Sequence, residues 1–251
     1  MKNSRIVFAK RPFGEPDDEC FRLEEVDVPP LSDNQLLIKV GWLSLDPYMR
    51  GRMNDVKSYV EPMQLGDVMT GESAGVVVES SSERFSPGDH VAVHQGWQSY
   101  IVCDDDDPRL MKIDLSNGSL SAHLGVVGMP GRTAYFGLKE VGKPQEGETL
   151  VVAAASGAVG SAVGQIAKIL GLRAVGIAGG PKKCAYVRDE LGFDDCIDYK
   201  EEGFTERLRE SCPNGVDIYF ENVGGKVTKA VAPLLNAGAR VPICGYISNY
   251  N

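Results

Sequence analysis

Short apolar runs separated by turn residues fill the first half of the chain. The runs are rich in Val, Ile, Leu and aromatic residues, and turn-forming stretches such as Pro29-Pro30 and residues 86–89 lie between them. We expect strands at residues 4–10, 21–26, 35–45, 75–79, 90–94, 97–102 and 111–113. Many short strands without helices between them predict a β-rich domain of the barrel or sandwich type.

The hydrophobic period changes in the second half, where strand-like runs alternate with helical patterns. Val159, Val163, Ile166 and Leu170 recur at helical spacing, and Gly171 ends that pattern. We expect strands at residues 149–154, 173–177, 196–199, 217–220 and 240–244, and helices at residues 159–170, 181–191, 204–211 and 226–235. This alternation predicts an α/β domain in which helices cover both faces of a parallel sheet.

The change of pattern places a domain boundary near residues 120–130. With 251 residues, 43% of them hydrophobic, the chain is long enough to form two modest domains, each with its own core. We predict these domains at residues 1–125 and 126–251, with residues 130–141 forming a bridging helix.

A glycine-containing turn follows the first strand of the second domain. In the run Ala155-Ser-Gly157-Ala158-Val159-Gly160, alanine takes the place of the first glycine of the dinucleotide-binding pattern. Gly157 would let the backbone approach a pyrophosphate, and Gly160 would let the helix pack against the strand. The N-terminus of the helix would present N–H groups and a partial positive charge to the phosphates. The alternative is that these are ordinary packing glycines between a strand and a helix.

The end of the next strand indicates which dinucleotide binds. An NAD site usually has Asp or Glu at this point, which accepts hydrogen bonds from the ribose hydroxyls. Residues 177–183 contain no acid but end in Lys182 and Lys183. Lysine attracts a 2′-phosphate that a carboxylate would repel, so the expected cofactor is NADPH. The alternative is that both lysines lie on a solvated helix face.

Charge, hydrophobicity and the cysteine pattern argue against a nucleic-acid-binding, a membrane or a secreted protein. The formal net charge of −9 gives no basic footprint for nucleic acid. No apolar run has membrane-spanning length, and the N-terminus is too polar for a secretory signal. The six cysteines are scattered and contain no Cys-x-x-Cys pair, which favours reduced thiols in a cytoplasmic protein.

The pattern of possible metal ligands predicts no metal site. A catalytic zinc needs three protein ligands, and a structural zinc usually needs four. His90 and His94 lie four apart without an obvious third ligand, and His123 stands alone. The acidic residues 104–107 match no calcium-loop spacing.

Four segments carry a resemblance to a known family. They are residues 45–52 (LDPYMRGR), 124–135 (LGVVGMPGRTAY), 219–225 (YFENVGG) and 243–248 (ICGYIS). The glycine turn described above also belongs to the resemblance. In these segments the chain resembles the leukotriene/prostaglandin reductase and alkenal double-bond reductase branch of the medium-chain dehydrogenase/reductase superfamily, which includes the bacterial curcumin reductases. The similarity runs from about residue 5 to the end of the chain.

This resemblance implies a fold, an activity and a set of site residues. It implies a GroES-like substrate domain, a Rossmann domain with a doubly wound parallel sheet, and zinc-independent reduction of the carbon–carbon double bond in α,β-unsaturated ketones or aldehydes. It implies that Tyr48 lies near the cofactor and Tyr59 at the mouth of the substrate site. Conjugate reduction needs a hydrogen-bond donor to the carbonyl oxygen, and the candidates are Tyr48, Tyr59, the ribose hydroxyl of the cofactor and a group in the segment that relatives add after Asn251. The cofactor-binding residues that the resemblance implies are Pro47, Met129, Thr133, Gly157, Ala158, Val159, Gly160, Lys183, Tyr199, Asn222, Cys244 and Tyr250.

Arg132 and the C-terminus depart from the family pattern. Arg132 stands where many relatives carry an apolar residue. Relatives continue past Asn251 with a last strand and a return segment, so we expect the chain to be a fragment, and the homodimer of relatives is in question.

Two other functions are possible on the sequence. One is a quinone reductase of the same superfamily, and the other is a protein that binds the cofactor without turnover.

Overall fold

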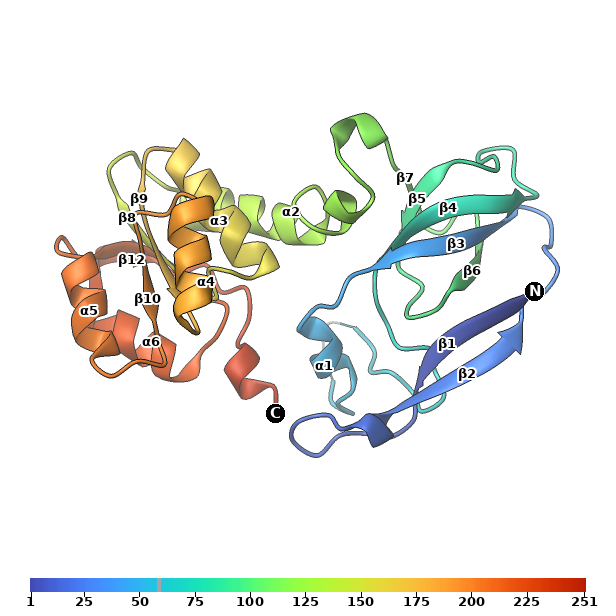
Figure 1. Ribbon diagram of the computed structural model, residues 1–251, viewed down its shortest axis with the longest axis horizontal. Helices are drawn as coiled ribbons and strands as arrows, with labels where there is room; N and C mark the ends of the chain where they lie inside the picture. The colour runs from blue at the N-terminus through green and yellow to red at the C-terminus, as the bar shows by residue number, and fades with distance from the viewer. Residues whose placement is uncertain (58–59) are drawn as a thin grey trace. The chain divides into compact units, whose positions relative to one another are not determined.

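The protein is described by a computed structural model, which covers residues 1–57 and 60–251 and divides them into two compact units (Figure 1). The first unit is Met1–Gly128 with Tyr250–Asn251, and the second is Met129–Asn249. The observed division after Gly128 lies three residues beyond the predicted one. Within the described residues, no helix is long and apolar enough to cross a membrane.

The first unit contains an antiparallel five-stranded sheet with the strand order β6-β3-β4-β5-β7. Its strands are β3 (Gln35–Leu43), β4 (Ser73–Ser80), β5 (His90–Val93), β6 (Tyr100–Asp104) and β7 (Met111–Lys112). One face of the sheet packs around the buried residues Leu36, Ile38, Val91 and Ile101. A separate hairpin pairs β1 (Lys2–Phe8) with β2 (Phe21–Asp27), and the short helix α1 (Tyr48–Arg52) follows β3. The predicted β-rich domain is therefore confirmed.

The second unit contains a parallel five-stranded sheet with the order β10-β9-β8-β11-β12. Its strands are β8 (Thr149–Ala153), β9 (Arg173–Ala178), β10 (Asp195–Asp198), β11 (Val216–Phe220) and β12 (Leu235–Arg240). Its helices are α2 (Met129–Phe136), α3 (Ala158–Ile169), α4 (Pro181–Ala185), α5 (Phe204–Ser211) and α6 (Gly225–Val231). The strand order reverses on either side of β8, and the loops after the carboxyl ends of the strands at such a point bind ligands in open α/β sheets. The predicted α/β fold is confirmed.

Strand β8 is buried on both faces, which explains its continuous apolar sequence. Leu150 and Val152 point into one core, which includes Val163 of α3. Val151 and Ala153 point into the other core, with Leu208 of α5. Figure 1 shows α3 and α4 on one side of this sheet and α5 and α6 on the other. The period-2 alternation of β8 therefore builds two cores at once.

The prediction of a strand at residues 240–244 is wrong, because the fifth strand is β12 (Leu235–Arg240) and ends where the predicted strand began. This segment contains Asn236 and Gly238, residue types that are uncommon in strands, yet its backbone pairs with β11 through an irregular register. Pro242 has no N–H to donate to a ladder. Ile243 keeps an isolated parallel bridge to Glu221.

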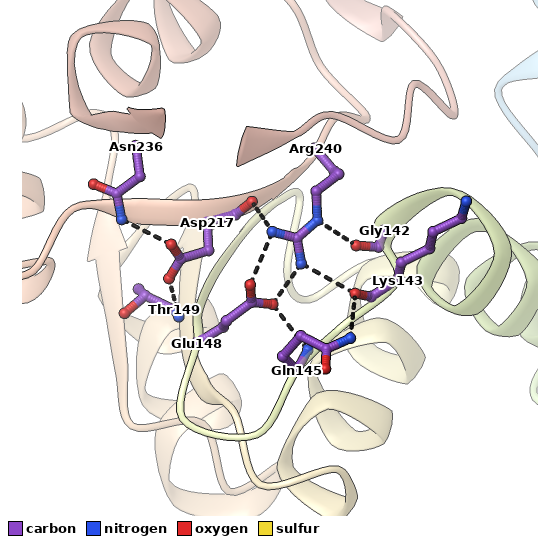
Figure 2. Close-up of polar contacts among 8 residues, drawn as sticks. All are labelled: Gly142, Lys143, Gln145, Glu148, Thr149, Asp217, Asn236 and Arg240. Atoms are coloured by element: carbon purple, nitrogen blue, oxygen red, sulfur yellow. Dashed lines mark hydrogen bonds and ion pairs between the residues drawn. The ribbon is translucent and has the colours of Figure 1, made fainter. Parts of the chain in front are cut away.

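Arg240 anchors the end of β12 (Figure 2). Its guanidinium donates to the carbonyl oxygens of Gly142 at 2.8 Å and Lys143 at 3.1 Å. The same group forms a bidentate ion pair with Glu148, one bond of which is 2.9 Å. This hydrogen-bonded ion pair raises the pKa of Arg240. The network fixes β12 through a side chain, and periodicity cannot reveal such an anchor.

Candidate functional site

The N-terminus of α3 lies directly after β8 at the carboxyl edge of the parallel sheet. The helix has 12 residues, and Gly157 precedes it with no side chain bonded to the helix end. The first main-chain bond of the helix runs from the Ser161 N–H to the Gly157 carbonyl at 2.9 Å. The N–H groups of Ala158, Val159 and Gly160 therefore precede the first intrahelical bond, in the arrangement that binds phosphate.

Gly160 is required by close packing of the loop on the helix. A Cβ at this position would lie 2.3 Å from the carbonyl oxygen of Ala154. Ala154 itself has a left-handed backbone conformation, with φ of 53°. A Cβ at Gly157 would lie 3.2 Å from the same oxygen, a tighter contact than most side chains make. The loop is therefore tight enough that any side chain at Gly160 would force it to move.

The alanine in the first glycine position has a structural explanation. Ala155 is fully buried, and its N–H donates to the Ile177 carbonyl at 3.0 Å. The neighbouring strand carries Gly176, where a Cβ would lie 2.8 Å from the Ala155 Cβ. Gly176 thus provides the space that the methyl group of Ala155 occupies.

The end of β9 carries small residues and nearby cations. Gly179 and Gly180 follow the strand, and Gly180 has φ of 98°. A Cβ at Gly179 would lie 3.1 Å from the Tyr199 hydroxyl and 3.2 Å from Lys200 Cε. Lys183 is exposed on α4, which begins two residues after Gly179. The end of β9 therefore has glycines without side chains, with the Tyr199 hydroxyl and two lysine side chains nearby in the fold or in the sequence.

Lys226 and Asp198 make further contacts at this end of the sheet. The Lys226 Nζ donates to the Tyr199 carbonyl at 2.9 Å and lies 4.7 Å from the centre of the Tyr199 ring. Asp198, at the end of β10, accepts from the Lys200 N–H at 2.9 Å. Backbone N–H groups of Gly180 and Lys200 lower the pKa of Asp198. The Asp198 carboxylate is thus held by the main chain and organises the turn at Gly180.

Asn222 and Glu221 organise the end of β11. The Asn222 side-chain amide donates to the Ala153 carbonyl at 2.8 Å. Glu221 is buried and accepts from the N–H groups of Val223 at 2.7 Å and Gly224 at 2.9 Å, and also from the Thr228 hydroxyl. The exposed Cys244 donates its backbone N–H to the Glu221 carbonyl at 2.9 Å.

The first unit holds its own polar cluster around Tyr48, the first residue of α1. The Tyr48 hydroxyl lies 3.1 Å from Nε2 of His94, and the Thr70 hydroxyl lies 3.1 Å from the same nitrogen. The rings of Tyr48 and His94 meet edge to face, with centres 6.1 Å apart. Burial is the main cause that lowers the pKa of His94, and the positive charges of Arg109 and Arg52 lower it further. Burial and these charges therefore favour the neutral form of the imidazole.

The structure brings part of the predicted set together. Gly157, Ala158, Val159, Gly160 and Asn222 meet around the end of β8, and Tyr199 lies beside Gly179. Their roles toward a cofactor stay predictions.

The remaining predicted residues lie elsewhere. Met129 and Thr133 share the start of α2, where the Thr133 hydroxyl is 3.5 Å from the Met129 sulfur. Pro47 directly precedes α1, Tyr250 lies outside the helices and strands, and Tyr59 falls outside the described residues.

Sequence reasoning missed several residues at these places. They are Thr70, His94, Gly176, Gly179, Lys200, Glu221 and Lys226. Gly179 was visible as part of the Gly-Gly pair after a predicted strand, whereas the contacts of Thr70 and His94 join segments that are far apart in sequence. Among the residues that the structure describes, no group of three or more His, Cys, Asp and Glu side chains is placed to hold a metal ion.

Comparison with known proteins identifies the family. Residues 4–113 match a family described as the N-terminal domain of oxidoreductase, and residues 158–251 match one described as zinc-binding dehydrogenase. The chain is 52% identical to the NADPH-dependent curcumin reductase of Escherichia coli, over 100% of this chain and 72% of that protein. It is 40% identical to the NADP(+)-dependent 2-alkenal reductase of Nicotiana tabacum, over 100% of this chain and 74% of that protein.

A solved structure agrees with these relatives. The crystal structure of CurA from Vibrio vulnificus in complex with NADPH is 51% identical, with a TM-score of 0.94, over 98% of this chain and 73% of that one. Identity at this level over nearly the whole chain shows more than a shared fold. The chain therefore belongs to the medium-chain dehydrogenase/reductase superfamily, in the branch that contains the curcumin and 2-alkenal reductases.

Proposed function

We propose that the protein reduces the carbon–carbon double bond of α,β-unsaturated ketones and aldehydes with NADPH. The observation that carries the proposal is the end of β9, where the bare backbone of Gly179 lies beside Tyr199 and Lys200, and α4 with its two lysines begins two residues later. The reductase names of the relatives and the NADPH complex of CurA support the same activity.

The residues of the second unit fit the cofactor. The N–H groups of Ala158, Val159 and Gly160 would hold the pyrophosphate, because no side chain closes this end of α3. Lys183 and Tyr199 would hold the adenosine ribose and its 2′-phosphate. The Asp198 carboxylate accepts from the backbone N–H groups of Gly180 and Lys200, which fixes the turn that leads to the lysines of α4.

Asn222, Cys244, Met129 and Thr133 are proposed for the ribose and nicotinamide side, together with Pro47 and Tyr250. Asn222 is held by its bond to Ala153, which directs its side chain across the end of β8. NADPH supplies hydride, which adds to the β-carbon of the substrate. The protein contributes binding, orientation and hydrogen-bond donors.

A tyrosine hydroxyl is proposed as the donor to the substrate oxygen. Negative charge builds on the carbonyl oxygen as the β-carbon gains hydride, and a hydrogen-bond donor aimed at that oxygen lowers the barrier. Tyr48 and Tyr59 are the candidates. A proton from solvent then completes the saturated product at the α-carbon.

A quinone reductase is the second candidate, since it would use the same nucleotide site. A protein that binds NADPH without turnover is the third. The test is to measure NADPH and NADH oxidation with enones, enals and quinones, together with fluorescence enhancement of bound NADPH. We expect oxidation by enones with NADPH preferred over NADH. Oxidation by quinones alone, or fluorescence enhancement without oxidation, would support the second or third candidate instead.

Location and partners belong to the same proposal. We propose that the protein acts in the cytoplasm on a small unsaturated carbonyl compound, with no nucleic acid or membrane partner. The five buried thiols support a reducing compartment, and burial raises the pKa of Cys212 to about 11. Whether two copies associate stays an open prediction.

A further inference from the structure

Two hydroxyl groups converge on one nitrogen of His94. Tyr48 comes from α1, Thr70 from the segment before β4, and His94 directly follows β5. Each hydroxyl oxygen is 3.1 Å from Nε2. We call these three residues the hydroxyl–imidazole cluster. All three lie in the first unit, and no sequence motif links them.

A single ring nitrogen cannot form equally strong hydrogen bonds with both hydroxyls at once. In a neutral imidazole, Nε2 carries either one hydrogen or one lone pair. If it carries hydrogen, it donates to Tyr48 or to Thr70. If it carries a lone pair, the two hydroxyls compete to donate to it. The proton on Nε2 and the direction of the Thr70 hydroxyl therefore influence whether the Tyr48 hydroxyl donates its hydrogen to the ring.

The charges around the cluster favour the neutral form of His94. Burial, Arg109 and Arg52 lower the pKa of its imidazole, and Asp107 opposes them. Asp107 is itself paired with Arg109 at 3.3 Å, which weakens its effect on His94. Arg52 also lies 5.9 Å from the centre of the Tyr48 ring and helps to fix that ring. Both hydroxyl contacts are made at Nε2, so the cluster is organised through this nitrogen.

We propose that His94 is a positioning residue for Tyr48, which works with Thr70 to direct the phenolic hydrogen away from the imidazole and toward the carbonyl oxygen of the substrate. This inference rests on the proposed enone reduction. When Thr70 donates to the Nε2 lone pair, Tyr48 no longer gives its hydrogen to the ring.

The test is a double-mutant cycle in the whole protein. We expect Tyr48→Phe and His94→Ala each to lower kcat for an enone by about 100-fold, as loss of a hydrogen-bond donor to a developing oxyanion does. Their combination should be no slower than Tyr48→Phe alone, because His94 acts through the phenol. The Kd for NADPH should stay within about twofold of the parent value. Equal losses from His94→Ala in both backgrounds would overturn the proposal.

Conservative variants separate positioning from folding. His94→Gln places an amide near the position of Nε2 and should recover part of kcat. The shorter side chain of His94→Asn should not reach the two hydroxyls and should not recover kcat. Thr70→Ser should keep kcat, and Thr70→Val should lower it. His90→Gln, on β5 and outside the cluster, is the matched control and should leave kcat unchanged. No recovery with His94→Gln together with full activity of Thr70→Val would contradict the proposal.

A measurement without turnover distinguishes a failure of the hydroxyl–imidazole cluster from a failure of the proposed enone reduction. We expect the nitrogen-15 resonance of His94 Nε2 to move in Tyr48→Phe and in Thr70→Val. An unchanged resonance in both variants would overturn the cluster itself. Moved resonances in a protein that reduces no enone would instead overturn the proposed function, and with it the role of the cluster toward substrate.

Discussion

The side-chain amide of Asn222 donates to the main-chain carbonyl of Ala153 at 2.8 Å, which joins the end of β11 to the end of β8 just before the glycine turn. Glu221 fixes the backbone on the other side of Asn222 by accepting from Val223 and Gly224. The loop that follows β11 is therefore coupled to the loop proposed to bind the pyrophosphate.

Asn222→Asp should weaken both folding and cofactor binding. The new carboxylate would face the Ala153 carbonyl oxygen without a donor, so the free energy of unfolding should fall by about 1–3 kcal/mol. Asn222→Ala removes the bond without adding charge and should cost less. Urea unfolding and NADPH titration of both variants test this, and an Asp variant as stable as the parent would refute it.

Gly160→Ala should disturb the glycine turn. Its Cβ would lie 2.3 Å from the Ala154 carbonyl oxygen, so the turn or the helix must shift. We expect a loss of about 1–3 kcal/mol in unfolding free energy and a weaker Kd for NADPH. Gly41→Ala on β3 is the matched control, because its Cβ would make an ordinary 3.7 Å contact. Equal stability and Kd in the two variants would contradict this account of Gly160.

Lys183→Glu should change the choice between the two dinucleotides. A carboxylate would repel the 2′-phosphate, so the Kd for NADPH should rise by at least about tenfold while the Kd for NADH changes little. Lys229→Glu, an exposed change of equal charge on α6, should leave both values unchanged. If Lys183→Glu keeps the preference of the parent protein, Lys183 is not a phosphate ligand.

The pH dependence of stability should report the burial of His94. The pKa of His94 is lower in the folded protein than in the unfolded chain, so unfolding takes up protons below about pH 6.5. The stability gained from a neutral His94 is therefore present above pH 6.5 and lost as the pH falls toward the folded pKa. His94→Gln should flatten this slope in chemical unfolding measured between pH 5 and 7.5, with His123→Gln as control. An identical slope in parent and His94→Gln would show that His94 is not perturbed.

Much of the fold followed from periodicity, because β8, α3 and α5 have apolar positions at the spacing of their elements. The strand at residues 240–244 was wrong because β12 contains Asn236 and Gly238 and is anchored by the side chain of Arg240 rather than by an apolar run. Long-range pairing of this kind leaves little trace in local sequence.

The candidate site also contains residues that the sequence could predict and residues that it could not. The glycine turn and the lysines of α4 were readable because each lies in one short segment with a known spacing. The hydroxyl–imidazole cluster was not, since Tyr48, Thr70 and His94 meet only after three separate segments fold. The contact between Gly179 and Tyr199 likewise depends on the pairing of β9 with β10.

The most direct test of the central claim is the fate of deuterium from NADPH labelled at the transferred position of the nicotinamide. The protein would be incubated with this cofactor and an enone, and the product would be examined by NMR. We predict a saturated ketone with deuterium on the β-carbon. Deuterium on the former carbonyl carbon of an allylic alcohol, or the absence of product with a folded protein that binds NADPH, would contradict the account.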